Sequence, residues 1–327
     1  MKRLLVLVFC LLLCISSVSP SVYANESNVH VVKAGDTLPD LAKQFETSVE
    51  EIKLSNGLQS DLLVVGQKIL IPFSYEVKAG EEMKDIALRF HSSVEEIKKA
   101  NGLQSEELYV GQNITVPPRK YKMDGHHILM TKDEFKDWII NNKFKRKISL
   151  IQQHHTWIPS YSRFNGSNHF LLLKGMENFH IQKMGWNQIA QNITTFPDGK
   201  IAVSRPINIA PEGTIGAQAN AVGIAIENLG NFDEGCDEMT KEQKDTIVYL
   251  TALLCLKFGL TPSVDSITYH HWWNVKTGER VLDKGPDYNV KTCPGTGFFG
   301  GNSTDSAKKY FYPLVTQKMK EMKASFE

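Results

Sequence analysis

Ser149-Leu150-Ile151-Gln152-Gln153-His154-His155-Thr156 is a short stretch with a pair of histidines near its end. We interpret it as a β-strand that ends in imidazole side chains. Ile267-Thr268-Tyr269-His270-His271 and Thr292-Cys293-Pro294-Gly295 are two further fragments with metal-ligand side chains. Two histidines and one cysteine can hold Zn²⁺ and leave its fourth position open to water. The fragments lie far apart in the sequence, so from their residues alone a zinc site remains one of two alternatives.

The composition of the whole chain is that of a globular protein. Its 327 residues are 42% hydrophobic and 22% charged, which excludes a disordered or collagen-like chain. With 37 Lys and Arg against 36 Asp and Glu, the near-zero net charge argues against a surface that neutralises nucleic-acid phosphates. Five cysteines are too few for a disulfide scaffold.

The N-terminus has the order of a signal peptide. A basic start at Met1-Lys2-Arg3 precedes an apolar run from Leu4 to Val18 and a small residue, Ala24, at the expected cleavage point. A membrane anchor is the alternative, but the run is shorter than the roughly 20 apolar residues that span a bilayer. We expect residues 1–24 to be removed, which leaves 35 basic and 36 acidic side chains and three cysteines. Three thiols cannot all pair within one chain.

The residues that follow form a tandem repeat with a constant offset of 45 positions. Val32-Lys33-Ala34-Gly35 recurs as Val77-Lys78-Ala79-Gly80, and Asn56-Gly57-Leu58-Gln59-Ser60 recurs as Asn101-Gly102-Leu103-Gln104-Ser105. Short β-branched runs flank two segments of helical spacing, so each copy is expected to be a small βααβ module. Pro117-Pro118-Arg119-Lys120 then forms a stiff basic junction.

This repeat resembles the LysM domain, a wall-binding module that recognises glycans containing N-acetylglucosamine. The resemblance covers both copies over their length, at residues 29–73 and 74–118. In that family the loop after the first strand and the loop near the Asn-Gly pair contact the ligand. The resemblance thus implies these glycan-binding residues: Gly35, Asp36, Thr37, Asn56, Gly57, Gly80, Asn101 and Gly102. Glu81-Glu82-Met83 replaces Asp36-Thr37-Leu38 in the second copy, where glycan binding is therefore open to question.

The remaining sequence predicts one larger domain at residues 123–320. Its expected elements form an α/β fold with a mixed central sheet flanked by helices. They include a capped helix from Thr131, a helix over 166–179, a hairpin around Pro197-Asp198-Gly199, a strand over 222–229 and a helix from Thr240 to Phe258. The helix over 166–179 is expected to turn Phe170, Leu173, Met176 and Phe179 toward the core. His126-His127 is expected to be solvated, Cys236 to be a free thiol and Cys255 to lie in the core.

Several fragments of this domain occur in the order of a known family. They are His154-His155-Thr156, Gly185-Trp186-Asn187-Gln188-Ile189, Pro197-Asp198-Gly199, Val222-Gly223-Ile224, Asn228-Leu229-Gly230-Asn231-Phe232, His270 and Lys291-Thr292-Cys293-Pro294-Gly295. Together they resemble the type 2 N-acetylmuramoyl-L-alanine amidases, whose fold is shared with T7 lysozyme and the peptidoglycan recognition proteins. The resemblance implies a Zn²⁺ cofactor held by His154, His270 and Cys293. His155 and His271 are then expected to have supporting roles.

Two residues are candidates for catalysis. Lys291 stands where the family has a lysine that helps to stabilise the oxyanion, and a cation near a metal has that effect physically; a solvated loop lysine is the alternative. Some family members use a tyrosine as the base, but that position here is Gln191, which cannot take up a proton. Others use a glutamate that corresponds to Glu227. The alternative is that Glu227 only anchors a neighbouring loop.

The resemblance implies an exported, cell-wall-associated hydrolase that cuts between N-acetylmuramic acid and L-alanine. Its partners would be the glycan strands and stem peptides of peptidoglycan, with no nucleic acid, no stable membrane insertion after cleavage and a monomeric state. A non-catalytic peptidoglycan sensor is the alternative, which the presence of Cys293 disfavours. The 23 positions from His270 to Cys293 include Trp272, Trp273 and Tyr288. These aromatics are expected either to shape the substrate groove or to pack within the loop.

Overall fold

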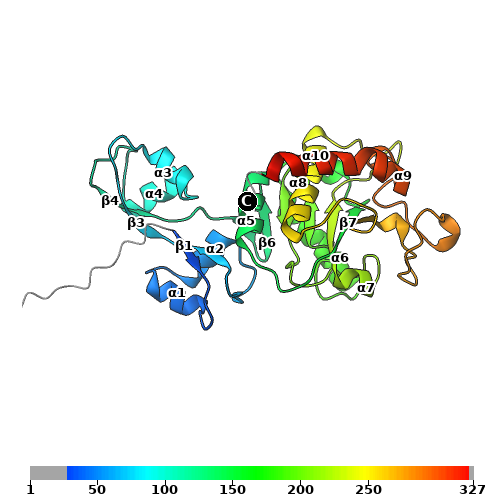
Figure 1. Ribbon diagram of the computed structural model, residues 1–327, viewed down its shortest axis with the longest axis horizontal. Helices are drawn as coiled ribbons and strands as arrows, with labels where there is room; N and C mark the ends of the chain where they lie inside the picture. The colour runs from blue at the N-terminus through cyan, green and yellow to red at the C-terminus, as the bar shows by residue number, and fades with distance from the viewer. Residues whose placement is uncertain (1–27, 324–327) are drawn as a thin grey trace, which may run out of the picture.

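The computed structural model describes residues 28–323, so the expected signal peptide at residues 1–24 lies outside the described residues. Two small modules occupy one end of the elongated molecule, and a larger domain occupies the other (Figure 1). Within residues 28–323, none of the helices has the length and apolarity needed to cross a membrane.

Each small module pairs its first and last strands in antiparallel register beside two helices, as the repeat predicts. The first module contains β1 (Val29–Val31), α1 (Leu38–Gln44), α2 (Val49–Asn56) and β2 (Lys68–Leu70). The second contains β3 (Phe73–Glu76), α3 (Met83–Arg89), α4 (Val94–Asn101) and β4 (Asn113–Val116). Each has its own small apolar core.

An asparagine amide joins helix to strand in both modules. The Asn56 Nδ2 donates to the carbonyls of Ile52 and Leu70, and its Oδ1 accepts from the Leu70 amide at 2.7 Å. Asn101 makes the equivalent three bonds to Ile97 and Thr115. Both side chains are therefore committed to holding the module together, which leaves the neighbouring backbone as the part of this loop that can meet a ligand.

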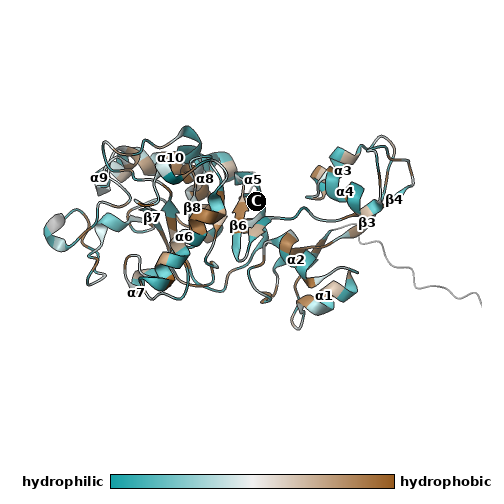
Figure 2. Cartoon of the chain, turned by 180° about the vertical axis from the view of Figure 1, so that it is seen from behind, coloured by the Kyte–Doolittle hydropathy of each residue, from teal (hydrophilic) through white to brown (hydrophobic). Residues whose placement is uncertain are grey.

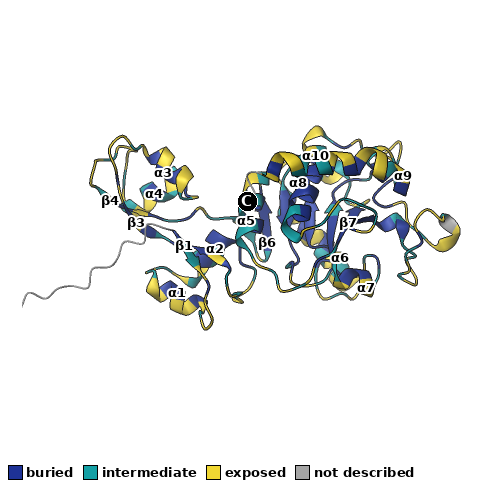
Figure 3. Cartoon of the chain, in the orientation of Figure 1, coloured by how far each residue is buried: buried dark blue, intermediate teal, exposed yellow. Residues whose placement is uncertain are grey.

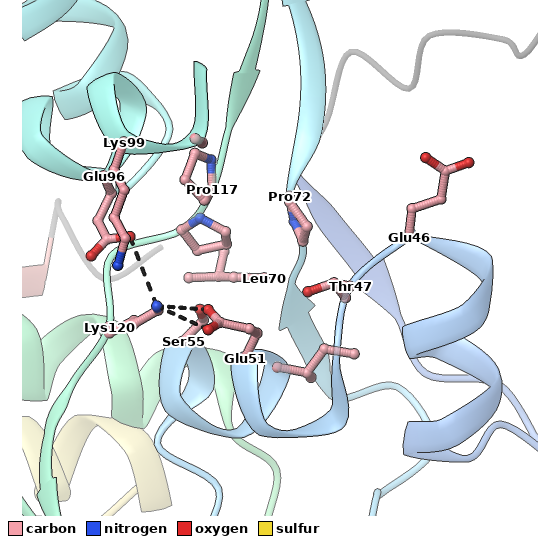
Figure 4. Close-up of a pocket in the computed structure, with 13 residues that line it drawn as sticks. Glu46, Thr47, Glu51, Ser55, Leu70, Pro72, Glu96, Lys99, Pro117 and Lys120 are labelled. Carbon is pink, nitrogen blue, oxygen red and sulfur yellow. Dashed lines mark hydrogen bonds and ion pairs between the residues drawn. The ribbon is translucent and has the colours of Figure 1, made fainter. Parts of the chain in front are cut away.

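The two modules face each other with equivalent surfaces. Between them lies a cavity of about 340 Å³, lined by pairs of residues 45 positions apart, such as Glu51 with Glu96 and Pro72 with Pro117. Lys120 of the junction points into this space, where its Nζ lies 2.8 Å from Glu51 and 3.9 Å from Glu96 (Figure 4). The basic junction thus bridges one acidic residue from each module.

The first module also packs against the large domain. The Nε1 of Trp138 donates to the carbonyl of Gly57 at 3.2 Å, and the amide of Gln59 donates to the carbonyl of His126 at 2.8 Å. A Cβ atom on Gly57 would lie only 3.0 Å from the Trp138 ring, whereas one on Gly102 would meet nothing within 4 Å. The Asn-Gly loop is therefore covered in the first module and open in the second.

The large domain is built on a mixed sheet of seven strands in the order β11-β7-β10-β8-β9-β6-β5. Strands β11, β7, β10 and β8 are parallel, and β9, β6 and β5 continue the sheet in antiparallel pairs. The strands are β5 (Lys122–Asp124), β6 (His127–Met130), β7 (Leu150–His155), β8 (Ile193–Thr195), β9 (Ile201–Val203), β10 (Gly223–Asn228) and β11 (Ile267–Tyr269). The mixed α/β fold is therefore confirmed.

Helices cover both faces of this sheet (Figures 1 and 2). They are α5 (Lys132–Asn141), α6 (His169–Gln182), α7 (Ala217–Ala221), α8 (Lys241–Phe258), α9 (Thr304–Ser306) and α10 (Tyr312–Lys323), with short 3₁₀ turns at Tyr161–Arg163, His270–Trp272, Pro286–Tyr288 and Phe298–Gly300 and a π turn at Ala307–Phe311. The main core joins α5, α8 and α10 to one face, and a second cluster joins α6 to the other. The central strands are almost wholly buried (Figure 3).

The structure corrects several expectations about individual residues. His127 begins β6 and is only 1% exposed, so the His126-His127 pair is not simply solvated. Helix α6 begins at His169, and Phe179 on it is 55% exposed rather than part of the core. For Trp272 the second of the two expected alternatives is confirmed, since it is fully buried and stacks on Tyr269.

Candidate metal centre and cleft

Three neighbouring parallel strands bring the candidate residues to one edge of the sheet. In the register of β10 and β7, Glu227 lies beside His154. In the register of β11 and β7, Tyr269 lies beside Gln153, so His270, the next residue along, reaches the level of His154. Because the carboxyl ends of parallel strands meet at the same edge, residues far apart in the sequence converge there.

His154, His270 and Cys293 form a compact, buried group, in which all three ligand atoms lie within 4.8 Å of one another. The Nδ1 of His154 is 3.1 Å from the Nδ1 of His270 and 3.6 Å from the Sγ of Cys293. Tetrahedral Zn²⁺ would hold two nitrogens about 3.4 Å apart, and a nitrogen and a sulfur about 3.6 Å apart. The spacing of these donors therefore fits zinc.

Hydrogen bonds orient the His154 ring toward this position. Its Nε2 lies 3.2 Å from the Oε1 of Gln152, an oxygen that also accepts a hydrogen bond from Thr214. An Nε2–H that donates to this carbonyl leaves the lone pair of Nδ1 free for a metal, which is the usual arrangement around ligand histidines. Gln152 itself is anchored by Asn220, to which its Nε2 donates at 3.0 Å.

Burial determines the protonation of the three donors. It lowers the pKa of His270 to about 3 and also depresses the pKa of His154, with the nearby His270 and Lys291 adding to the effect on His154. Both imidazoles are therefore neutral at neutral pH. Burial raises the pKa of the Cys293 thiol well above its usual range. A bound dication would deprotonate that thiol, so metal binding and proton release are coupled at this site.

His155 and His271 hold the surrounding backbone, as expected of supporting residues. The backbone N–H of His155 donates to the Cys293 Sγ at 3.4 Å, and the His155 Nδ1 accepts from the amide of Phe232. The amide of His271 donates to the carbonyl of Cys293 at 2.7 Å, and its Nδ1 lies 2.6 Å from the carbonyl of Lys291. These contacts fix the loop that carries both Lys291 and Cys293.

A cleft of about 860 Å³ opens above the three donors, and both Glu227 and Lys291 line it. The Oε2 of Glu227 is buried without a hydrogen-bond partner among the described residues. Burial raises the pKa of Glu227 to about 8, and the positive charge of Lys291 acts in the opposite direction. Glu227 is thus a carboxyl group that can hold or release a proton near neutral pH.

The walls of the cleft combine exposed apolar side chains with polar ones, which include Arg163, His180 and Thr214. Its exposed apolar residues are Trp157, Ile158, Leu171, Phe179 and Met184. Gln191, at the position of the family tyrosine, also lines the cleft and donates to Thr194 from its Nε2. The sequence did not place Phe179 at the cleft, because its spacing on α6 matches a core position. The apolar residues Leu171 and Met184 are the signal that could have indicated a second apolar surface on this segment.

A carboxylate closes the loop after the first strand in both modules, although helix α3 lacks the side-chain cap that α1 has. The carboxylate of Asp36 accepts from the Lys33 amide at 2.7 Å, and Thr37 caps α1. In the second module Glu81 accepts from the Lys78 amide at 2.9 Å, and Tyr75 and Arg89 hold its carboxylate. The longer side chain therefore reproduces the bond that Asp36 makes, despite the sequence departure. Gly35 and Gly80 are both open to solvent.

The fold and the donor group define a class of protein, namely α/β proteins in which two histidines and one cysteine meet at the edge of a parallel sheet. A family model described as N-acetylmuramoyl-L-alanine amidase matches residues 144–296, and the model for the LysM domain matches residues 30–72 and 75–117. Residues 144–296 thus belong to the N-acetylmuramoyl-L-alanine amidase family, and two LysM domains precede them. Both resemblances inferred from the sequence are confirmed.

Individual relatives match smaller parts of the chain. The probable peptidoglycan endopeptidase LytE of Bacillus subtilis (strain 168) is 48% identical over 40 residues, which are 12% of this chain and 12% of that protein. The solved N-acetylmuramoyl-L-alanine amidase LysC from Clostridium intestinale is 22% identical, covering 47% of this chain and 80% of that one at a TM-score of 0.34. Drosophila PGRP-LB is 19% identical, covering 52% and 85% at a TM-score of 0.39.

Proposed function

We propose that this protein is a zinc-dependent hydrolase of peptidoglycan, which cleaves the amide bond between N-acetylmuramic acid and L-alanine. The observation that carries the proposal is the convergence of His154, His270 and Cys293 at the floor of a cleft, inside the segment that belongs to the amidase family. We further propose that residues 1–24 direct its export and that it acts as a monomer at the cell wall, without nucleic-acid partners or membrane insertion.

The donor set supports zinc as the resident cofactor. Two neutral imidazoles and a thiol that a dication would ionise suit a borderline-soft metal, and three protein donors leave an open fourth position. Bound there, zinc would supply Lewis acidity to the scissile carbonyl and to a water molecule. Gln152 and the backbone of His155 support this role, because they orient one ring and stabilise the sulfur.

Two side chains of the cleft would stabilise the negative charge of the transition state and transfer the protons of the reaction. The cation of Lys291, an exposed residue that lines the cleft, would stabilise negative charge as it develops on the carbonyl oxygen. Glu227 would receive the proton released by the attacking water and deliver it to the departing amine of L-alanine. The raised pKa of Glu227 suits both steps, since the carboxyl group can exist in either form near neutral pH.

The composition of the cleft favours an amidase over a glycosidase. Glycosidases use two carboxyl groups that flank the scissile bond, but Glu227 is the one carboxylate among the residues that line the cleft in the described part of the chain. The exposed apolar side chains on the walls, including Leu171 and Phe179, offer surface to the methyl groups of a lactyl-alanine unit. We therefore infer that the stem peptide and its lactyl link enter this cleft.

The direct test is to identify the new end groups that form on glycan strands and peptides when the protein digests purified cell wall. An amidase releases new N-terminal alanine, and chelation of zinc is expected to stop this release while added zinc restores it. The measurement is N-terminal labelling of the soluble products beside an assay for new reducing sugar ends. New reducing ends without N-terminal alanine would contradict the proposal, and binding to the wall with neither product would point to a peptidoglycan sensor.

We also propose that the LysM modules bind wall glycans, and that the second module contributes more than the first. Gly35, Asp36 and Thr37 in the first module and Gly80 in the second lie on open loops. The loop at Asn101 and Gly102 is also open, but the loop at Asn56 and Gly57 lies against Trp138. In the second module, a glycan can therefore reach both loops without rearrangement. In the first module, Trp138 covers one of the two loops.

Matched substitutions at two exposed alanines test this difference. Ala34 and Ala79 occupy equivalent positions beside Gly35 and Gly80. Ala79→Glu is expected to weaken binding to insoluble peptidoglycan about tenfold, which corresponds to about 1.4 kcal/mol, whereas Ala34→Glu should have little effect. Co-sedimentation of protein that also carries Cys293→Ala measures binding without cleavage. Both variants add the same charge, so general repulsion from the wall would affect them equally, and equal losses would contradict the proposal.

A further inference from the structure

We propose that His126, His127 and Glu177 form a second zinc site, separate from the cleft, that fixes the wall of the cleft to the rest of the domain. His127 lies at the start of β6, His126 in the turn before it, and Glu177 on α6. Their ligand atoms all lie within 4.8 Å of one another, as in the group at the floor of the cleft. None of the three lines the cleft.

The distances in this group match those between donors on one metal ion. The Nε2 of His126 is 3.0 Å from one carboxylate oxygen of Glu177, and the Nε2 of His127 is 3.3 Å from the other. Donors at 2.0–2.2 Å from a tetrahedral zinc lie about 3.4 Å apart. The two rings are neighbours in space as well as in sequence, with centroids 4.3 Å apart. A single ion could therefore contact all three side chains without a large movement.

The surroundings hold the ligands in place. Side-chain exposure falls from 36% at His126 to 13% at Glu177 and 2% at His127, and the Nε2 of His126 is itself buried without a hydrogen-bond partner among the described residues. Burial lowers the pKa of His127 to about 4, with His126 adding to the effect, so this imidazole is neutral and able to bind a cation. The Ile189 amide donates to Glu177, which orients the carboxylate.

The site lies where three parts of the protein meet. Glu177 is on α6, and the neighbouring Met176 and Phe179 of that helix line the cleft. The histidines belong to the β5–β6 hairpin, and the carbonyl of His126 accepts from Gln59 of the first module. An ion here would tie α6 to the hairpin and to the module docked on it. Its role is therefore structural, since it would keep the cleft wall in place and take no part in the reaction.

The competing interpretation is an ordinary ion pair, in which Glu177 neutralises a protonated histidine and no metal binds. The two interpretations differ in metal content. Untagged protein without residues 1–24, dialysed against zinc and analysed by elemental mass spectrometry, is expected to contain two zinc ions per chain. Cys293→Ala should retain the ion held by Glu177, and His126→Ala should retain the ion in the cleft, so each variant is expected to contain one.

Cobalt provides a second readout that does not depend on activity. Co²⁺ bound to Cys293 gives a thiolate charge-transfer band, whereas the second site offers only nitrogen and oxygen donors. Cys293→Ala loaded with Co²⁺ should therefore keep weak ligand-field bands without the charge-transfer band, and adding His126→Ala should remove them. In the Cys293→Ala background, zinc should raise the temperature of unfolding, and His126→Ala should abolish that rise.

His91→Ala is the matched control, because His91 also pairs with a carboxylate, Asp137, but has no second histidine beside it. It should leave two zinc ions bound. Far-ultraviolet circular dichroism establishes that each variant is folded, and Glu177→Gln provides a second way to remove a ligand if His126→Ala fails to fold. One zinc ion in the wild-type chain, or two in the folded His126→Ala or Glu177→Gln variant, would overturn the proposal.

Discussion

Cys293→Ala is expected to lower the rate of peptidoglycan amide cleavage by about a thousandfold or more and to remove the zinc ion from the cleft. A zinc ion bound there would contribute several kcal/mol to the stabilisation of the transition state, and each 1.36 kcal/mol changes the rate tenfold. Cys293 is only 6% exposed, and its sulfur accepts the His155 amide, so no neighbouring side chain can take its place. The comparison is of kcat/KM on soluble muropeptides together with bound zinc.

The two other cysteines of the described chain are the natural controls. Cys236 is exposed and Cys255 is buried in α8, and both are free thiols. Cys236→Ser should leave activity and zinc content unchanged. Cys255→Ala removes one buried sulfur atom and should lower the unfolding temperature slightly without loss of zinc in the folded protein. An active Cys293→Ala enzyme, or equal losses in all three variants, would argue against the zinc centre.

The elements that carry the site could be predicted because their patterns are local. The sequence predicts a strand that ends at His155, and a capping residue and a terminal glycine mark the helix from Lys241 to Phe258. The repeat predicts both small modules, since each element recurs 45 positions later. The grouping of His154, His270 and Cys293 is different, because nothing in their spacing brings them together. Their residue types make a zinc site one of two alternatives, and the resemblance to a family then assigns the three ligands.

The features that the sequence did not predict all depend on packing between distant segments. His127 is buried at the start of β6, where its Nε2 lies 3.3 Å from the carboxylate of Glu177 on α6. The Asn-Gly loop of the first module is covered because Trp138 donates a hydrogen bond to Gly57. Each of these contacts joins surfaces that are separate in the sequence, so periodicity and turn signals contain no information about them.

Glu227→Gln is expected to lower kcat by about 10²- to 10⁴-fold, the range typical of a general acid–base group, while zinc content stays unchanged. The amide has nearly the same shape as the carboxyl group but cannot carry a proton between water and the leaving amine. Glu227 is suited to this role because its Oε2 has no hydrogen-bond partner among the described residues and its side chain lines the cleft above the donors. Gln191→Leu is the control, since Gln191 lines the same cleft but cannot transfer a proton.

The pH dependence of the free energy of unfolding distinguishes a Glu227 that transfers protons from a Glu227 that only anchors a loop. In the metal-free protein, burial raises the pKa of Glu227 from 4.5 to about 8. Between these values the folded state holds a proton that the unfolded chain has lost, so the free energy of unfolding should fall as pH rises from 4.5 to 8. Glu227→Gln should remove this part of the slope and stabilise the apo protein at pH 8 relative to wild type, as urea unfolding at several pH values would measure. If Glu227 anchored a loop instead, the substitution would destabilise the protein at every pH and leave kcat of the folded, zinc-bound enzyme close to that of wild type.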